Sequence, residues 1–266
     1  MRPHRRIMWR MESPVPISVE QLEREAAKAA VGYTKQKGYV RSGEFISHFQ
    51  DHAEYELLRL GLPPADIGVG NRQSIHFHLK KNQYVLGAYF PKEMDVWVGA
   101  DFSGPLLGIS FKSMMRGVGQ NVNNRWEELV GDAANIHSRF PMLSLGYVMI
   151  LPTMSYKGTG DDGAREPLID PGTGRPTNLA LQIERKLLGI RGRRQPVELP
   201  SVYEEVALAV FDFEADQPRL HREFPGPKSL LRIERFFDAL VGHFQRRNTY
   251  VPQQPLPQGE GGLAED

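Results

Sequence analysis

The sequence contains no cysteine. This absence excludes disulfides, thiol nucleophiles and cysteine-based zinc sites, and it fits a reducing compartment. The chain also lacks any run of the ~18 apolar residues that a membrane span requires, and its basic N-terminus has no apolar stretch of the kind found in secretory signals. We therefore expect a cytoplasmic protein that does not enter a membrane.

The chain has almost no net charge, because 33 Lys and Arg residues balance 32 Asp and Glu residues. The field of the whole molecule therefore gives no guide to partners, and any basic surface must be local. Hydrophobic residues make up 40% of the 266 residues and charged residues 24%, which are ordinary values for a chain that folds. Since single cores stop growing at roughly 250 to 300 residues, we expect one main core.

The two ends of the chain differ in composition from its body. Residues 1–16 are basic and close on two prolines, which is typical of a flexible arm that contacts phosphates or stays solvated. Residues 251–266 are rich in Pro, Gln and Gly, which is typical of a disordered tail. Between them we expect a single domain over residues 17–250.

Hydrophobic periodicity predicts how this domain is organised. Helical spacing between Ser18 and Gly61 predicts two helices, and alternation from Ser74 predicts two or three short strands. A further strand, a helix and a nearly continuous apolar strand are expected at 104–113, 122–141 and 143–152. A strand and helix extension covers 178–248. This order predicts an α/β fold with a mixed central β-sheet flanked by helices.

An isolated lysine ends one of the predicted strands. This strand, 104–113, is apolar at its start, and its period of two puts Ser110 and Lys112 on one face. On the preceding strand, Asp95 interrupts an apolar alternation. Neighbouring strands of a hairpin can bring this carboxylate beside Lys112, so that a carboxylate and an ammonium group share one end of the sheet.

An acidic residue on one strand, followed by an acidic-x-Lys triplet on the next, resembles the PD-(D/E)XK superfamily of restriction-endonuclease-like nucleases. The resemblance covers about residues 43–151 and implies a restriction-endonuclease-like core. Here Ser110 stands where the family usually has Asp or Glu, and the segment Glu93–Asp95 replaces the Pro-Asp pair. The chain is similar to a branch of restriction enzymes that has Ser-x-Lys on the strand and a carboxylate that has migrated to the following helix.

The helix after the lysine strand carries two candidates for the migrated carboxylate, Glu127 and Glu128. At about 100° per residue, Glu127 lies at the edge of the apolar face, near Val130, whereas Glu128 points largely away. We therefore favour Glu127 as the ligand. Glu128 is expected to be solvated or to pair with Arg125.

The resemblance implies metal-dependent hydrolysis of DNA phosphodiester bonds. Asp95, Glu127 and the backbone carbonyl of Phe111 would hold one or two Mg²⁺ ions, with Mn²⁺ as a substitute, and the metal would bind the attacking water. Lys112 would orient or deprotonate that water and offset charge on the phosphate. Ser110 would contribute at most a hydrogen bond.

Polar and basic residues downstream are the candidates for contact with nucleic acid. They are Arg116, Gln120, Asn121, Asn123, Asn124, Arg125, Arg191, Arg193 and Arg194. For the asparagines, capping of the helix is an equally good explanation. The family implies double-stranded DNA as the partner, with RNA as the alternative, and a homodimer or a subunit of a larger defence complex. The Phe-rich helix near the end is a candidate interface, although core packing explains it equally well.

Several other functions compete with cleavage. The first is a catalytically inactive nuclease-like fold that binds DNA or a partner protein, with Ser110 marking lost catalysis. A serine enzyme of the S-x-x-K type needs its lysine three residues after the serine, whereas Lys112 is two after Ser110. His137 lies on an apolar helix face, as core histidines do. His76 and His78 share a strand face, but without a third ligand they are more typical of a surface pair.

Overall fold

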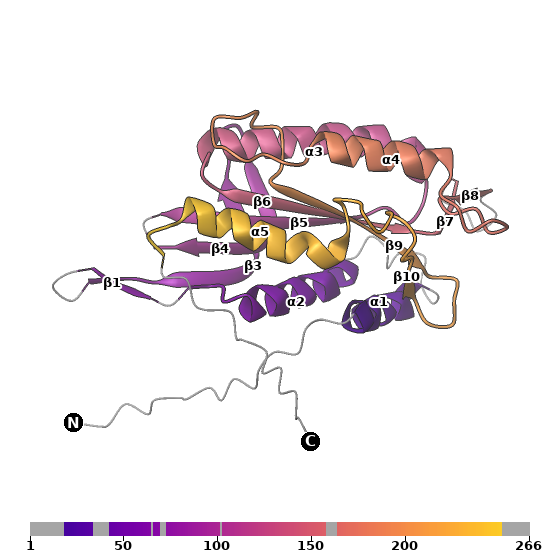
Figure 1. The fold of residues 1–266 in the computed structure, drawn as a ribbon, viewed down its shortest axis with the longest axis horizontal. Coiled ribbons are helices and arrows are strands. Elements are labelled where there is room, and N and C mark those ends of the chain that lie inside the picture. The colour runs from indigo at the N-terminus through magenta and orange to yellow at the C-terminus, as the bar shows by residue number, and fades with distance from the viewer. Residues whose placement is uncertain are drawn as a thin grey trace, which may run out of the picture.

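The computed structural model describes residues 19–33, 43–64, 66–69, 73–101, 103–157 and 164–251. The predicted basic arm at 1–16 and the predicted tail after Val251 lie outside these ranges. Within them the chain forms an α/β structure with a six-stranded mixed sheet and helices on both faces (Figure 1). None of the helices in the described ranges is long and apolar enough to cross a lipid bilayer.

The elements follow the predicted order. The helices are α1 Val19–Tyr33, α2 Gly43–Arg59, α3 Val118–Arg139, α4 Asn178–Gly189 and α5 Ile233–Arg247. The strands of the central sheet are β3 Phe77–Leu86, β4 Pro91–Ala100, β5 Gly104–Ser113, β6 Ser144–Pro152, β9 Glu205–Asp212 and β10 Arg219–Leu220. Two small sheets pair β1 Ile67–Val69 with β2 Gln73–Ile75, and β7 Met154–Tyr156 with β8 Arg165–Pro167.

The central sheet has the strand order β10-β9-β6-β5-β4-β3. The strands β3, β4 and β5 form an antiparallel meander, and β5, β6 and β9 run parallel to one another. Every residue of β6 is buried, as expected for a continuous apolar strand covered on both faces. The helices α1, α2 and α5 cover one face of the sheet, and α3 and α4 cover the other (Figure 1).

The Phe-rich helix α5 belongs to the core. Its aromatic residues Phe236, Phe237 and Phe244 are at most 5% exposed, and they pack with α2 and the sheet. Burial of each such side chain contributes roughly 1.5 to 3 kcal/mol. Of the two explanations offered by the sequence, core packing is therefore the one that the structure shows.

The strand β4 separates from β5 next to Asp95. The two strands pair only between Val96–Ala100 and Gly104–Ile109, so the end of β5, Ser110–Ser113, has β6 on one side and no β4 partner on the other. On β3 the residue opposite Asp95 is Asn82, which has a left-handed φ of 53° and interrupts the β3–β4 ladder. Asparagine adopts this conformation more readily than most residues. We call this opening, between Asp95 and Ser110–Ser113, the fork.

Beyond the fork, the tip of the β3–β4 hairpin packs on α3. The side-chain oxygen of Asn135 accepts hydrogen bonds from the backbone N–H groups of Tyr89 and Phe90 at 2.8 and 3.2 Å, and its amide donates to the Phe90 carbonyl at 2.9 Å. Lys92 on β4 forms an ion pair with Asp132 on α3. These contacts hold the β3–β4 hairpin against α3 on the side of the fork nearer the tip.

A buried charged cluster joins the start of β9 to α3 and α5. The Glu204 carboxylate accepts hydrogen bonds from Arg193 and from the Leu145 N–H, both at 2.8 Å, and from Arg247, and His137 Nε2 lies 3.1 Å from it. Burial acts to raise the pKa of Glu204, but the hydrogen bond to His137 and the nearby positive charges outweigh it and lower the pKa to about 2. The carboxylate therefore stays ionised inside the protein.

We predict that Glu204→Gln lowers the free energy of unfolding by about 3 to 5 kcal/mol, because it leaves Arg193 and Arg247 buried without their counter-charge. Urea unfolding followed by circular dichroism measures this loss. The control is Glu223→Gln at an exposed carboxylate, which should change the free energy by less than about 0.5 kcal/mol. Equal effects of the two substitutions would show that the cluster does not hold the fold together.

A second prediction concerns acid stability. His52 on α2 packs against the ring of Phe237, and burial lowers the pKa of His52 to about 4 from an ordinary value of 6.5. The unfolded chain therefore binds more protons than the folded chain between these values, and stability falls as the pH drops through that window. In His52→Leu this part of the loss should disappear, as measured by urea unfolding at several pH values. An unchanged slope of stability against pH would exclude His52 as its source.

Candidate active site

Asp95 is the carboxylate at the base of the fork. Its Oδ2 accepts a hydrogen bond from the Phe111 N–H at 2.8 Å, and its Oδ1 accepts one from Gln50 Nε2 at 3.0 Å. Gln50 also donates to the Asn82 side chain at 2.7 Å, so α2, β3 and β5 all position this group. Burial raises the pKa of Asp95, and the hydrogen bonds and the charge of Lys112 offset only part of the effect. A carboxylate with a raised pKa is a frequent mark of a functional site.

Lys112 lies beside a carboxylate of α3. Its Nζ is 3.3 Å from Glu128 Oε1, and about a third of each side chain is exposed. Glu128 also accepts a hydrogen bond from Arg125. Burial acts to raise the pKa of Glu128, but Lys112 and Arg125 outweigh it and lower the pKa below its ordinary value. The structure thus brings a lysine and two carboxylates to one end of the sheet, as the sequence predicted for Asp95 and Lys112.

The helix carboxylate is not the one that the periodicity favoured. Glu127 is exposed to solvent, whereas Glu128 faces Lys112, so the predicted orientation of the two residues is wrong. The predicted pairing of Glu128 with Arg125 is confirmed. The prediction took Val130 as part of the apolar face, although Val130 is only partly buried. The fully buried side of α3 lies further round, which turns Glu127 outward.

Ser110 takes part in packing beside the site. It is 7% exposed, and its hydroxyl lies 3.8 Å from the sulfur of Met94 on β4. A weak contact of this kind agrees with the expectation that Ser110 contributes at most a hydrogen bond. The residue in register with Ser110 on the next strand is Tyr147.

Tyr147 is a polar residue of this region that sequence reasoning missed. Its ring is fully buried, with its centroid 5.7 Å from that of Tyr203, whose hydroxyl donates to the Leu129 carbonyl of α3 at 3.0 Å. The Tyr147 hydroxyl has no hydrogen-bond partner among the described residues. Burial, and then the charge of Glu128, raise the pKa of Tyr147 well above its ordinary value. Because this tyrosine lies inside an apolar strand, nothing in the sequence distinguishes it from a core residue.

A second ion pair, Lys92 with Asp132, flanks the fork, and sequence reasoning missed it as well. Asp132 lies one helical turn after Glu128, and this i,i+4 spacing in the sequence places the two carboxylates on the same side of the helix. Charges of both signs therefore surround the fork, in the set Asp95, Glu128, Asp132, Lys92, Lys112 and Arg125. Because the three anionic and three cationic side chains balance, one of these groups can change its ion-pair partner without leaving the site with a net charge.

The polar residues that precede the glutamates lie on the first turns of α3, because the helix begins at Val118, four residues earlier than predicted. Four of them have exposed side chains: Gln120, Asn121, Asn123 and Asn124. None of them caps the helix. The N-cap is Gly117, whose φ of 58° suits glycine, and Glu166 on β8 accepts from the Gly119 N–H at 3.0 Å. The asparagines are thus free of the capping role, and contact with nucleic acid stays a prediction for them.

The predicted basic stretch is largely structural, which corrects the prediction for two of its arginines. Arg193 is 1% exposed and pairs with Glu204. Arg191 makes two hydrogen bonds to Glu205, at 2.8 and 2.9 Å. Both arginines are thus already engaged with buried carboxylates and are not available to a phosphate. Of the stretch, Arg194 has an exposed side chain and keeps its predicted role.

The remaining sequence candidates have ordinary partners. His76 lies 2.8 Å from Asp66, and His78 lies 2.9 Å from Asp101, in agreement with two surface pairs. The guanidinium group of Arg116 lies over a ring, 5.8 Å from its centroid, which belongs to Tyr156. In the part of the chain that the structure describes, no group of three or more His, Asp or Glu side chains is placed to hold a metal ion.

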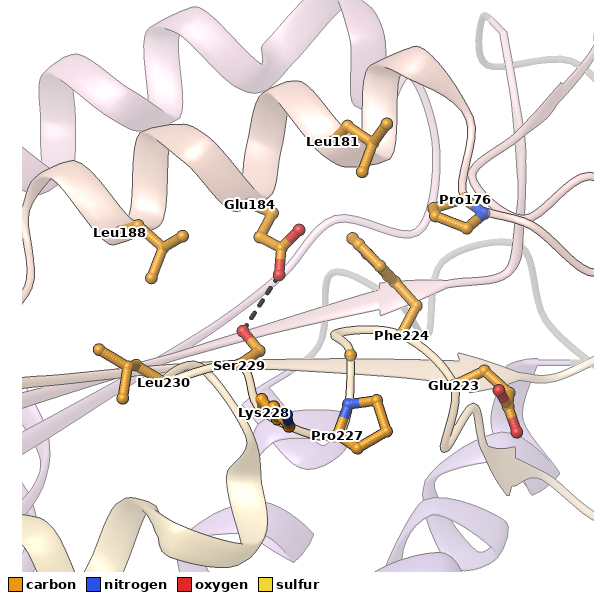
Figure 2. A pocket seen from close by; sticks show the side chains of 11 residues that line it. Pro176, Leu181, Glu184, Leu188, Glu223, Phe224, Pro227, Lys228, Ser229 and Leu230 are labelled. Carbon is orange, nitrogen blue, oxygen red and sulfur yellow. Dashed lines mark hydrogen bonds between the residues drawn. The ribbon is translucent and has the colours of Figure 1, made fainter.

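A groove of about 770 Å³ lies away from the fork, between α4 and the segment 223–230 (Figure 2). Its walls are mainly apolar, with Leu181 and Leu188 on the helix and Phe224 on the segment, and Ser229 donates a hydrogen bond to Glu184 across it at 3.0 Å. The helix α4 packs on β9, which β6 separates from β5. The groove therefore contains none of the predicted site residues.

Comparison of the chain with protein-family models, with curated proteins and with solved structures gives no match. The function must therefore be argued from the chemistry of the site. The relevant geometry lies where β4 and β5 separate: Lys112 pairs with Glu128 at 3.3 Å and is also an electrostatic neighbour of Asp95.

Proposed function

We propose that this protein is a metal-dependent endonuclease that hydrolyses DNA phosphodiester bonds at the fork. The observation that carries the proposal is the convergence of three side chains from three elements: Asp95 from β4, Lys112 from β5 and Glu128 from α3. Carboxylates beside a lysine supply the groups that metal-assisted phosphodiester hydrolysis requires. The resemblance to restriction enzymes favours a role in defence against invading DNA.

The element order supports a restriction-endonuclease-like core for the domain. A helix, α2, is followed by the antiparallel meander β3, β4 and β5, then by α3, and then by β6, which returns parallel to β5. The same order of helix, strands, helix and strand was expected from the sequence over about residues 43–151, the part of the chain that the resemblance covers. The migrated carboxylate is then Glu128 rather than Glu127, because Glu128 is the one beside Lys112.

The donors at the fork fit one hydrated magnesium ion. Magnesium keeps several of its waters and is bound through one or two carboxylates together with substrate phosphates, so an open site with few protein ligands suits it. Asp95 and Glu128 would supply the carboxylates and the Phe111 carbonyl a further oxygen. Each oxygen of Asp95 accepts one hydrogen bond from the protein and retains a lone pair. A bound ion would polarise the phosphate and lower the pKa of a bound water.

The protein groups then have distinct tasks. Gln50 and the Phe111 N–H orient the Asp95 carboxylate by the hydrogen bonds that they donate. Lys112 offsets negative charge that develops on the phosphate, and its exposed fraction of about a third leaves it reachable by a substrate. Glu128 is half-buried between two cations, so it is ionised and ready to bind a metal in exchange for one of them.

A second candidate function is a nuclease-like fold that binds DNA or a partner protein without cutting. Two observations favour it. Ser110 is 7% exposed and supplies no anionic oxygen where the family usually has one. Glu128 is already neutralised by Lys112 and Arg125. Cleavage and metal binding distinguish the two candidates.

We predict that the purified protein cuts plasmid DNA with Mg²⁺ or Mn²⁺ and not with EDTA. Asp95→Asn, Lys112→Ala and Glu128→Gln should each lower the rate about 10²- to 10³-fold, because each removes a group that stabilises the transition state. The matched control is Glu127→Gln, which makes the same chemical change one residue away and should cut within about twofold of the wild type.

Three outcomes of this assay would contradict the proposal. Cleavage by Lys112→Ala at the rate of the wild type, or cleavage that persists in EDTA, would place the chemistry elsewhere. A wild-type protein that binds DNA and leaves it intact under all conditions would select the non-cutting candidate. Single-stranded DNA and RNA, tested beside the plasmid, identify the nucleic acid that is cut.

We also predict direct metal binding without DNA. Isothermal titration with Mn²⁺ should show at least about tenfold weaker binding for Asp95→Asn and for Glu128→Gln, since each loses one of the two carboxylate ligands. Glu127→Gln should bind as the wild type does. If Glu127→Gln weakens binding and Glu128→Gln does not, the assignment of the helix ligand is reversed.

A further inference from the structure

The Tyr147 hydroxyl is a polar atom that the proposed site does not yet explain. It is buried, and among the described residues it has no hydrogen-bond partner. A buried hydroxyl without a partner destabilises the folded protein, and phenylalanine would fill the same space without this penalty. Such a group in a folded protein calls for a partner that arrives with ligand or solvent.

Tyr147 lies on the face of the sheet that α3 covers, which is also the face on which Lys112 meets Glu128. Tyr147 on β6 is in register with Ser110 on β5, and Met149, two residues later on β6, is in register with Lys112. On its other side the ring packs against Tyr203, which is tied to the α3 backbone through the Leu129 carbonyl. The ring therefore lies between the sheet and α3, at the level of α3 where Glu128 meets Lys112.

The charges of the site reach this hydroxyl. Besides burial, the carboxylates of Glu128, Asp132 and Asp95 all raise the pKa of Tyr147, and Arg125 lowers it, so the residues around the fork are also the electrostatic neighbours of the phenol. A phenol has an ordinary pKa of about 10 and is a hydrogen-bond donor at neutral pH. The hydroxyl is thus a buried donor with three carboxylates among its electrostatic neighbours.

We infer that Tyr147 is a further catalytic residue of the proposed nuclease, whose hydroxyl donates a hydrogen bond to the water that attacks the phosphate. This inference rests on the proposed function. In the hydrolysis the water oxygen bonds to phosphorus and the bond from phosphorus to the leaving oxygen breaks. One proton of the water reaches the leaving oxygen by way of solvent, and Tyr147 keeps its own proton. The hydrogen bond orients the water and stabilises the hydroxide that forms from it.

Tyr147→Phe and Tyr203→Phe are a matched pair for the test, because both remove one buried phenol hydroxyl and the two rings touch. For Tyr147→Phe we expect kcat for plasmid cleavage to fall at least about tenfold, the size of one lost hydrogen bond, with KM within about twofold. The cleavage rate of Tyr147→Phe should rise with pH, and the midpoint of this rise should lie at a higher pH than in the wild type, because the hydroxide is less stabilised. Its unfolding midpoint in urea with EDTA should be unchanged or higher.

For Tyr203→Phe we expect the opposite result. This substitution removes the hydroxyl that donates to the Leu129 carbonyl. The unfolding midpoint should therefore fall, while kcat stays within about twofold of the wild type. If Tyr147→Phe cuts as fast as the wild type, or unfolds as readily as Tyr203→Phe, the inference is overturned and the proposed function stands. If the wild-type protein shows no metal-dependent cleavage, both are overturned, and the wild-type assay alone reveals this.

Discussion

The hydrogen bond from the Phe111 N–H to the Asp95 carboxylate is the interaction on which the rest of the site depends. Beyond Ile109, a regular antiparallel ladder would offer Phe111 a β4 carbonyl, but β4 has already turned away. A buried N–H without a partner is costly, and the side chain of Asp95 supplies the missing acceptor. This one hydrogen bond therefore has two effects. It holds the Asp95 carboxylate in a buried position, and it satisfies the Phe111 N–H where β4 no longer pairs with β5.

The protein uses charge in two different ways. Around Glu204 the charged groups are almost fully buried, and Arg193, Arg247 and His137 surround one carboxylate. Removing the carboxylate would leave buried positive charges without a counter-charge, which is strongly destabilising. At the fork, Lys112 and Glu128 are each about a third exposed, and such pairs contribute little to stability. Little free energy is lost when their partners change. The first cluster stabilises the fold, and the second is free to change partners, as the proposed metal site requires.

Much of this arrangement was predictable from the sequence, because strand patterns and isolated charges are local signals. Alternation located β3 and β4, and apolar runs located β5 and β6. Asp95 and Lys112 stood out because each is a charge in an apolar strand. The choice between Glu127 and Glu128 needed the rotation of α3 about its axis, and this depends on which apolar residues the sheet actually covers.

Other features depend on contacts between distant segments, for which a single sequence carries no signal. In the sequence Arg193 stands in a basic stretch, and only the tertiary structure shows that Glu204, just before β9, lies beside it. Tyr147 lies in a run of apolar residues, and its significance comes only from the partner that its hydroxyl lacks. The capping of α3 by Glu166 joins residues 47 positions apart. In each case the chemistry is set by tertiary structure rather than by neighbours in the chain.

The contact of Asn135 with the hairpin tip links two groups that share no backbone ladder. Asp95 lies on β4 and Glu128 on α3, and the hairpin tip ties these elements together through the Asn135 amide. Gly87 makes this contact possible, because a Cβ there would lie 2.2 Å from the amide nitrogen of Asn135. The position of β4 relative to α3 therefore depends on a turn, residues 87–90, that contains neither Asp95 nor Glu128. A larger residue at position 87 would displace the Asn135 amide, so a substitution there would change the shape of the fork while all of its charged side chains stay the same.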